Sequence, residues 1–270
     1  MEHGNSGLIR NASDVLLVMA LITLPVDGTR LGVIMPYWTP IAPVFFTLYV
    51  LCNLRLFLRS MRQYLGFFLF LPLLVAVSFF GWLTVGFHRM YVFQTMFALV
   101  SGLACLASLD IAFRLKRLDW NRAVTIVVIV YWIAFMAGVL QWLDSRYGIE
   151  PVTFLSQHLM ERNYVPRKPQ FLFAEPSYIG MHIFGVLLPL FWLTRRKSLA
   201  LLVLVFAFGS ACMGVGVRIL IDTVIALLLW AVIEIRWNRA RNIIAAFVGI
   251  GAISIGGTLM LLRNARVQSL

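Results

Sequence analysis

The sequence predicts an all-α fold, a polytopic integral membrane helix bundle of about nine transmembrane helices with one long extracytoplasmic loop. Of its 270 residues, 61% are hydrophobic and 13% are charged, and the mean hydropathy is +0.89. A bilayer core takes about 20 helical residues per crossing, and apolar stretches near that length fill most of the chain. We therefore expect a single transmembrane domain over residues 1–270, which excludes a tethered soluble enzyme, a secreted protein and a nucleic-acid binder.

Hydropathy places the expected spans in order along the chain. The first is short because Pro25, Asp27 and Arg30 interrupt it, and prolines also introduce the second. We find no internal repeat that would divide the chain into similar halves. The expected spans cover residues 13–26, 41–56, 65–85, 91–113, 123–143, 178–194, 198–215, 219–235 and 243–262.

The net charge of +12 is explained by topology. Lys and Arg are more numerous on one set of alternate connections than on the other, and the cytoplasmic side of a membrane protein carries that excess. The rich set includes the connections at residues 55–62, 114–122, 195–197 and 236–241. This pattern predicts a multi-pass protein of the cytoplasmic membrane with a cytoplasmic N-terminus.

The loop at residues 144–177 is the only long connection between expected spans, and the same alternation makes it extracytoplasmic. Within it, Phe154, Leu155 and Leu159 would share one face of a helix, as in a short helix that lies on a membrane surface. A loop packed on the bundle fits this pattern equally well. We expect function to concentrate in this connection.

The end of this loop, residues 167–177, reads RKPQFLFAEPS and leads directly into the next span. Arg167 and Lys168 precede the carboxylate of Glu175. Neighbouring cations favour the ionised form of a carboxyl group. Glu175 is therefore either their salt-bridge partner or a carboxylate that positions or activates an acceptor hydroxyl.

The next helix is predicted to begin at this point. Pro176 suits a first helical turn, because its missing N–H would be unpaired there anyway. Glu175 or Ser177 can cap the free amides. His182 lies seven residues after Glu175 and shares its helix face. A histidine in a membrane helix is more often a hydrogen-bonded packing residue than a catalyst, and both alternatives stay open for His182.

A second charged position follows the short turn at Gly214 and Gly216. Arg218 would lie at another outer helix N-terminus, and two such ends with cations at one membrane level suit a phosphate or pyrophosphate. Alternatively, Arg218 pairs with Asp222 on one helix face. Asp222 lies in an apolar stretch, where an ionisable group is costly and is a functional candidate.

Asp110 and Arg114, at a cytoplasmic end of the expected span 91–113, are expected to pair or to extend toward water.

The segment KPQFLFAEPSY at residues 168–178 resembles the R-x-x-G-x-F-x-E-P-S signature of bacterial exopolysaccharide repeat-unit polymerases, members of the O-antigen polymerase and ligase superfamily. Lys168 stands at the usual arginine, unless Arg167 takes that role, and Phe171 replaces the usual glycine. Residues 210–214 look only loosely like the small Ser/Gly segment of the family. Members continue into a second outer loop and further helices beyond the point that corresponds to residue 270, so we expect a C-terminally truncated member.

The resemblance implies a metal-independent membrane glycosyltransferase without a cofactor. It would polymerise polyprenyl-pyrophosphate-linked oligosaccharide repeat units into exopolysaccharide or O-antigen outside the cytoplasmic (inner) membrane. The implied partners are the lipid-linked glycan, the bilayer, a chain-length regulator and a flippase, and no nucleic acid. The related O-antigen ligase, a non-enzymatic exporter or flippase, and a structural membrane subunit stay open, although the sequence lacks the matched half-repeats of a transporter.

The expected site follows from these motifs. The candidate catalytic residues are Glu175, Arg167, Lys168 and Arg218. The candidate substrate-binding residues are Ser177, Tyr178, His182, Asp222, Gly214 and Gly216. In this hypothesis the cations stabilise the leaving pyrophosphate, Glu175 orients the acceptor, and Ser177 fixes Glu175 by capping the helix.

Overall fold

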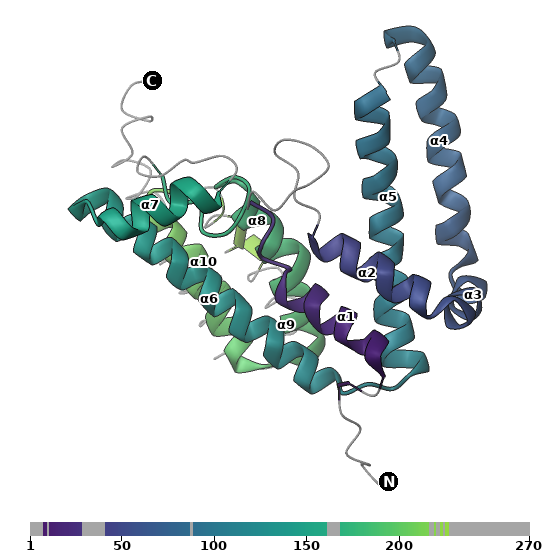
Figure 1. The fold of residues 1–270 in the computed structure, drawn as a ribbon, viewed down its shortest axis with the longest axis horizontal. Helices are drawn as coiled ribbons and strands as arrows, with labels where there is room; N and C mark the ends of the chain where they lie inside the picture. Colours follow the sequence, from purple (N-terminus) through teal and green to yellow (C-terminus); the bar gives the residue numbers. More distant parts are fainter. Residues whose placement is uncertain are drawn as a thin grey trace, which may run out of the picture. The chain divides into compact units, whose positions relative to one another are not determined.

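Helices make up all the regular structure of the described chain, which confirms the predicted all-α class (Figure 1). The computed structural model describes residues 8–9, 11–28, 41–86, 89–160, 168–215, 219, 222–223 and 225–226. The chain divides into two compact units. The first comprises Met1–Asp27 and Leu31–Val130, and the second comprises Gly28–Arg30 and Tyr131–Leu270.

Two helices in the described residues are long and apolar enough to cross a membrane, namely Thr95–Leu115 and Trp120–Tyr147. The pair Ile41–Cys52 and Leu54–Gln63 raises the number to three if it forms one span, but it is bent by 100°. The chain therefore has the character of a membrane protein. The number of crossings stays a prediction, because the expected spans 219–235 and 243–262 lie almost wholly outside the described residues.

The first unit contains α1 (Ala12–Ile22), α2 (Ile41–Cys52), α3 (Leu54–Gln63), α4 (Leu65–Val85), α5 (Arg89–Leu109) and the π-helix η1 (Asp110–Leu115). Helix α1 packs on α2, and α2 packs on α5. Leu17 of α1 and the α2 residues Phe46 and Tyr49 are buried at these contacts. The predicted span 65–85 coincides with α4.

The predicted span 41–56 is wrong beyond Cys52, because the chain bends at Asn53. The Asn53 side-chain Nδ2 donates to the carbonyl of Tyr49 at 2.8 Å, while the Asn53 backbone N–H donates to Val50 at 3.0 Å. The side chain thus takes the carbonyl that the next helical N–H would use, which is how asparagine competes with a helix. The chain then continues as α3 in a new direction.

The first turns of the long helix α6 (Trp120–Tyr147), up to Val130, belong to the first unit, and the rest belongs to the second. The second unit continues with α7 (Glu150–Leu159), α8 (Tyr178–His182), the π-helix η2 (Ile183–Leu187), α9 (Leu188–Thr194) and α10 (Lys197–Cys212). Helices α8, η2 and α9 form one apolar segment, Tyr178–Thr194, with the bounds predicted for that span. Pro189 has no N–H to donate to an earlier carbonyl, which accounts for the wider turns of η2 just before it.

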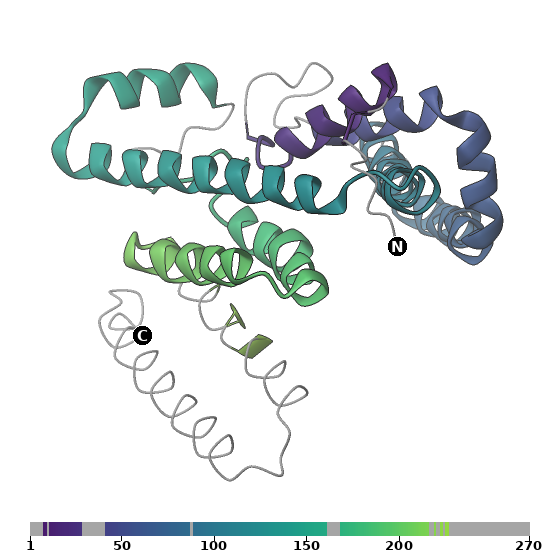
Figure 2. The same ribbon diagram turned by 90° about the horizontal axis from the view of Figure 1, so that it is seen from below.

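Helix α7 turns back along α6 after Gly148, whose φ is +64° (Figure 2). The carboxylate of Asp144 fastens this reversal, because both of its oxygens lie 2.7 Å from Thr153 Oγ1. Phe154 and Leu155 are 63% and 60% exposed. This exposure supports the interpretation of the segment as a surface helix and not as a loop packed on the bundle.

Candidate functional site

The signature-like segment is fastened to α6 by the side chain of Gln141. Its Oε1 accepts the backbone N–H groups of Gln170 and Phe171, each at 2.9 Å. Its Nε2 donates to the carbonyl of Phe171 at 2.7 Å. Gln141 is only 5% exposed and Phe171 is fully buried. Since buried backbone groups are costly without partners, one amide side chain satisfies the polar backbone at this turn.

Phe171 has a φ of +62°, in the left-handed region that disfavours residues with a side chain. The signature to which this segment is similar has glycine at this position, and glycine adopts this backbone without strain. In this chain a phenylalanine adopts the left-handed backbone. The three hydrogen bonds between the Gln141 side chain and the backbone of Gln170 and Phe171 offset the steric cost.

The Phe171 ring fills the space that a glycine would leave empty. It stacks on Phe206 of α10 with ring centroids 5.6 Å apart, and on Phe173 at 5.9 Å. The ring packs directly against Gly138 of α6, where a Cβ would overlap it, so the absence of a side chain at Gly138 makes room for the ring. The segment is therefore held by packing as well as by hydrogen bonds.

Gly28 contacts the next two residues of the segment, Leu172 and Phe173. Its N–H donates to the carbonyl of Leu172 at 3.1 Å, and a Cβ at Gly28 would overlap the backbone of Phe173. Only glycine allows two backbones to approach so closely. The segment thus has contacts on both sides before it reaches Glu175.

His182 supports the segment from the helix side. Its ring stacks on Phe173, with centroids 4.3 Å apart and an interplanar angle of 20°. Its Nδ1 lies 2.7 Å from the hydroxyl of Tyr131 on α6. His182 is thus the hydrogen-bonded packing residue that one of the two alternatives predicted, and it does not line the cavity described next.

A cavity of about 830 Å³ lies beside the segment, within the second unit. Its wall brings together Lys168, Ser177, Gly214 and Asp222, which were named as site residues although they come from distant parts of the chain. Apolar side chains, among them Phe184, complete the wall. The cavity combines an exposed cation, a hydroxyl and a carboxylate with a mainly apolar surface, so it suits an amphipathic ligand.

Lys168 is exposed and forms no ion pair with another described residue. A salt bridge from Lys168 to Glu175, one of the predicted alternatives, is therefore not formed. Glu175 is half-buried, and its Oε2 accepts a long hydrogen bond of 3.4 Å from Ser177. Glu175 is not part of the cavity wall.

The helix cap predicted for Ser177 is wrong. Ser177 itself has helical dihedral angles, φ −66° and ψ −24°, and its side chain makes no capping hydrogen bond. A capping residue needs an extended backbone so that its oxygen can turn toward the next amides. Tyr178, which begins α8, donates its backbone N–H to the carbonyl of Glu175 at 3.0 Å.

Three predicted site residues, Arg167, Gly216 and Arg218, lie outside the described residues. The predicted phosphate site at two helix N-termini depends on these cations and stays a prediction. The sequence reasoning missed Gln141, and it missed Gly138, against which the Phe171 ring packs. One signal was present, because Gln141 is an uncharged polar residue in an apolar helix, and such residues usually bind a neighbouring segment.

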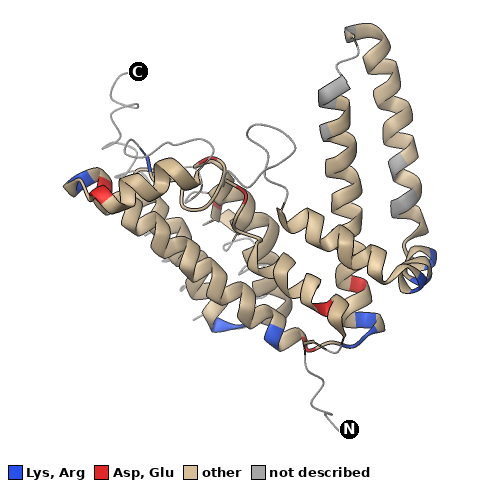
Figure 3. Cartoon of the chain, in the orientation of Figure 1, with Lys and Arg blue, Asp and Glu red and all other residues tan. Residues whose placement is uncertain are grey.

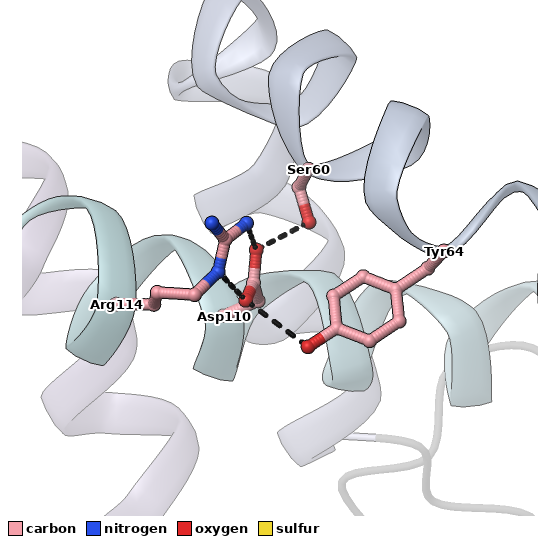
Figure 4. Close-up of polar contacts among 4 residues, drawn as sticks. All are labelled: Ser60, Tyr64, Asp110 and Arg114. Atoms are coloured by element: carbon pink, nitrogen blue, oxygen red, sulfur yellow. Dashed lines mark hydrogen bonds and ion pairs between the residues drawn. The ribbon is translucent and has the colours of Figure 1, made fainter.

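The first unit has its own polar cluster, centred on Asp110 (Figure 4). The Asp110 carboxylate accepts hydrogen bonds from Ser60 at 2.7 Å, from Tyr64 at 3.3 Å and from Arg114 Nη2 at 2.6 Å. The predicted pairing of Asp110 with Arg114 is thus confirmed. The cluster also joins α3, through Ser60, to η1.

A second ion pair in the same unit is buried. Lys116 Nζ is 2.6 Å from the carboxylate of Asp14, and it lies 5.1 Å from the ring centroid of Tyr49. Figure 3 shows the charged residues of this unit near one end of α5, on α1 and on α3, whereas α4 carries none. The Asp14–Lys116 pair joins α1 to the segment after η1, whereas the arginines of α3 form no ion pair within the described residues.

No family model, curated protein or solved structure matches the chain.

Proposed function

We propose that the chain is a membrane glycosyltransferase that polymerises polyprenyl-pyrophosphate-linked oligosaccharide repeat units into exopolysaccharide or O-antigen outside the cytoplasmic membrane. One observation carries this proposal. The segment that is similar to the polymerase signature is clamped beside a cavity whose wall contains Lys168, Ser177, Gly214 and Asp222.

The proposed reaction moves a growing glycan from its lipid carrier to the next repeat unit. An acceptor hydroxyl oxygen bonds to the anomeric carbon, while the bond from that carbon to the pyrophosphate oxygen breaks. The pyrophosphate leaves with the electron pair, and Lys168, with Arg167 and Arg218, stabilises the negative charge that develops on it. Glu175, which immediately precedes the wall residues Pro176 and Ser177 in the chain, orients the acceptor hydroxyl at the edge of the cavity and receives or relays its proton.

The cavity fits both parts of such a donor. Lys168 supplies an ammonium group for the pyrophosphate. Met181, Phe184 and Ile219 offer an apolar surface for an isoprenoid chain. The rigid support from Gln141 favours this proposal as well, because a positioning loop must hold its groups within a fraction of an ångström.

The test replaces Lys168, Glu175 and Arg167 singly by alanine in a strain whose own copy is deleted. We expect polymer extension to fall on the order of 100-fold for Lys168→Ala, since it loses one charge-stabilising group, and to be lost for the other two. Gln157→Ala, at an exposed position of α7, is the matched control and should keep the full polymer length.

The same strains separate the alternatives. Single lipid-linked repeats that accumulate outside the membrane support polymerase activity, whereas accumulation inside indicates a flippase. Long free polymer that fails to reach its final acceptor indicates a ligase. Unchanged polymer length in all three variants, with normal membrane insertion, would overturn the proposed site.

A further inference from the structure

Helix α3 presents a basic face to its surroundings. Arg55, Arg59 and Arg62 follow one another at helical spacing, and all three are exposed. None of them forms an ion pair within the described residues. No acidic residue occurs in Leu54–Gln63, so the positive charge of this face is not neutralised within the helix.

A second exposed face of α3 is apolar and adjoins the first. Leu54 and Leu58 lie one turn apart and are 52% and 57% exposed. The helix that follows also exposes apolar side chains, because Leu65 and Leu69 of α4 are 52% and 58% exposed. Large apolar side chains exposed on two consecutive helices require a cover of acyl chains or of another protein.

The third face fixes the helix to the rest of the first unit. Ser60 is buried and Tyr64 is half-buried, and both donate hydrogen bonds to Asp110 (Figure 4). Helix α3 therefore cannot rotate to hide its leucines without breaking these bonds. The 100° bend at Asn53 also turns α3 almost perpendicular to the uncharged helix α2.

We propose that α3 is an interfacial helix that binds the phosphate groups of anionic phospholipids through Arg55, Arg59 and Arg62. Guanidinium groups form paired hydrogen bonds with phosphate oxygens, and basic residues near a membrane surface favour anionic lipids. Leu54 and Leu58 insert among the acyl chains at the same level. Such a helix combines a charged face and an apolar face at the boundary of a bilayer.

A lipid surface explains the two exposed faces better than an acidic protein partner does. The arginines match a negatively charged surface, while the leucines are followed in the chain by the uncharged helix α4, whose exposed apolar side chains also suit acyl chains. The proposal is independent of the glycosyltransferase assignment, because it uses no residue of the second unit.

The experiment uses the full chain in phosphatidylcholine vesicles that contain phosphatidylglycerol. The native cysteines are replaced by serine, and Q63C carries a bimane fluorophore at the exposed end of α3. Headgroup-proximal doxyl labels are placed either on phosphatidylglycerol or on phosphatidylcholine at equal mole fraction. We expect doxyl-phosphatidylglycerol to quench about twofold more strongly or better, with a preference that weakens as salt rises.

Two triple variants test which property of α3 matters. R55Q/R59Q/R62Q should lose the preference, whereas R55K/R59K/R62K keeps the charge and should retain at least part of it. Equal quenching by the two labelled lipids in the unmodified helix would overturn the proposal, as would bimane that neither lipid quenches, which is the outcome for a helix covered by a protein partner. Both readouts come from the parent chain, so they decide the matter even if a variant fails to fold.

Discussion

The two units hold their buried polar groups in different ways. In the first, Asp14 and Lys116 form an ion pair between two side chains. In the second, Gln141 binds backbone groups of Gln170 and Phe171. A pair of side chains can be removed together by mutation, but backbone groups remain whatever the sequence is. Apolar side chains can therefore replace the Asp14–Lys116 ion pair, but they cannot replace the Gln141 side chain, because the backbone groups that it binds would stay buried without a partner.

The largest expected effect therefore comes from Gln141→Leu. This change leaves two buried N–H groups and one carbonyl without their partner, at about 1–3 kcal/mol each. We expect a destabilisation of roughly 3–9 kcal/mol, measured as a lowered apparent melting temperature in detergent micelles. Gln157→Leu on exposed α7 is the control and should change stability by less than about 0.5 kcal/mol. A melting temperature equal to that of the parent would contradict the clamp.

Asp14→Ala should have a slightly smaller effect. Asp14 is fully buried and the side chain of Lys116 is 11% exposed, so the ammonium loses its carboxylate in a place that water hardly reaches. Breaking a buried ion pair from one side costs about 3–5 kcal/mol. The same thermal measurement checks this value.

The double variant Asp14→Leu with Lys116→Met sharpens the comparison. Replacement of both partners by apolar residues removes the unpaired charge, so the part of the stability lost through that charge should return. The hydrogen bond that the Asn11 backbone N–H donates to Asp14 at 3.0 Å is absent from both variants and cancels in the comparison. No second substitution can do the same for Gln141→Leu by apolar replacement alone. If the double variant is as unstable as Asp14→Ala, apolar side chains cannot replace the ion pair of the first unit, and the contrast with Gln141 fails.

The smallest expected effect concerns the left-handed backbone of Phe171. Phe171→Ala and Phe171→Gly both lose the buried ring, but only glycine removes the steric cost of the positive φ. Phe171→Gly should therefore be more stable than Phe171→Ala by about 1 kcal/mol. Parallel melting curves give the difference directly. If alanine is equal to or better than glycine, Phe171 carries no such cost.

The helices that sequence analysis predicted best are uninterrupted apolar runs. Residues 65–85 and 178–194 were predicted with the bounds that the structure has, because polar residues or prolines end these runs sharply. Hydropathy failed at Asn53, since an average over many residues does not register one side chain that takes a backbone carbonyl. The π-helices were also missed, because they leave the hydropathy of a segment unchanged.

The candidate site was predicted in part. Lys168, Ser177, Gly214 and Asp222 were named from local motifs and a resemblance, and they line one cavity. The support for the segment was not predicted, because Gln141 lies about 30 residues away and its role depends on the fold. The cap at Ser177 was wrong because the dihedral angles of a single residue decide it.

The packing of the Phe171 ring makes the residues allowed at positions 138, 141 and 171 depend on one another. Alanine at Gly138 would overlap the Phe171 ring, so it becomes acceptable only after the ring has been removed. A ring at position 171 is in turn tolerated on a left-handed backbone that Gln141 holds. The effect of a substitution at one of these positions on stability therefore depends on which residues already occupy the other two. A change from glycine to phenylalanine at position 171 is tolerated best when Gln141 is already present. A redesign of this segment must therefore vary the three residues together.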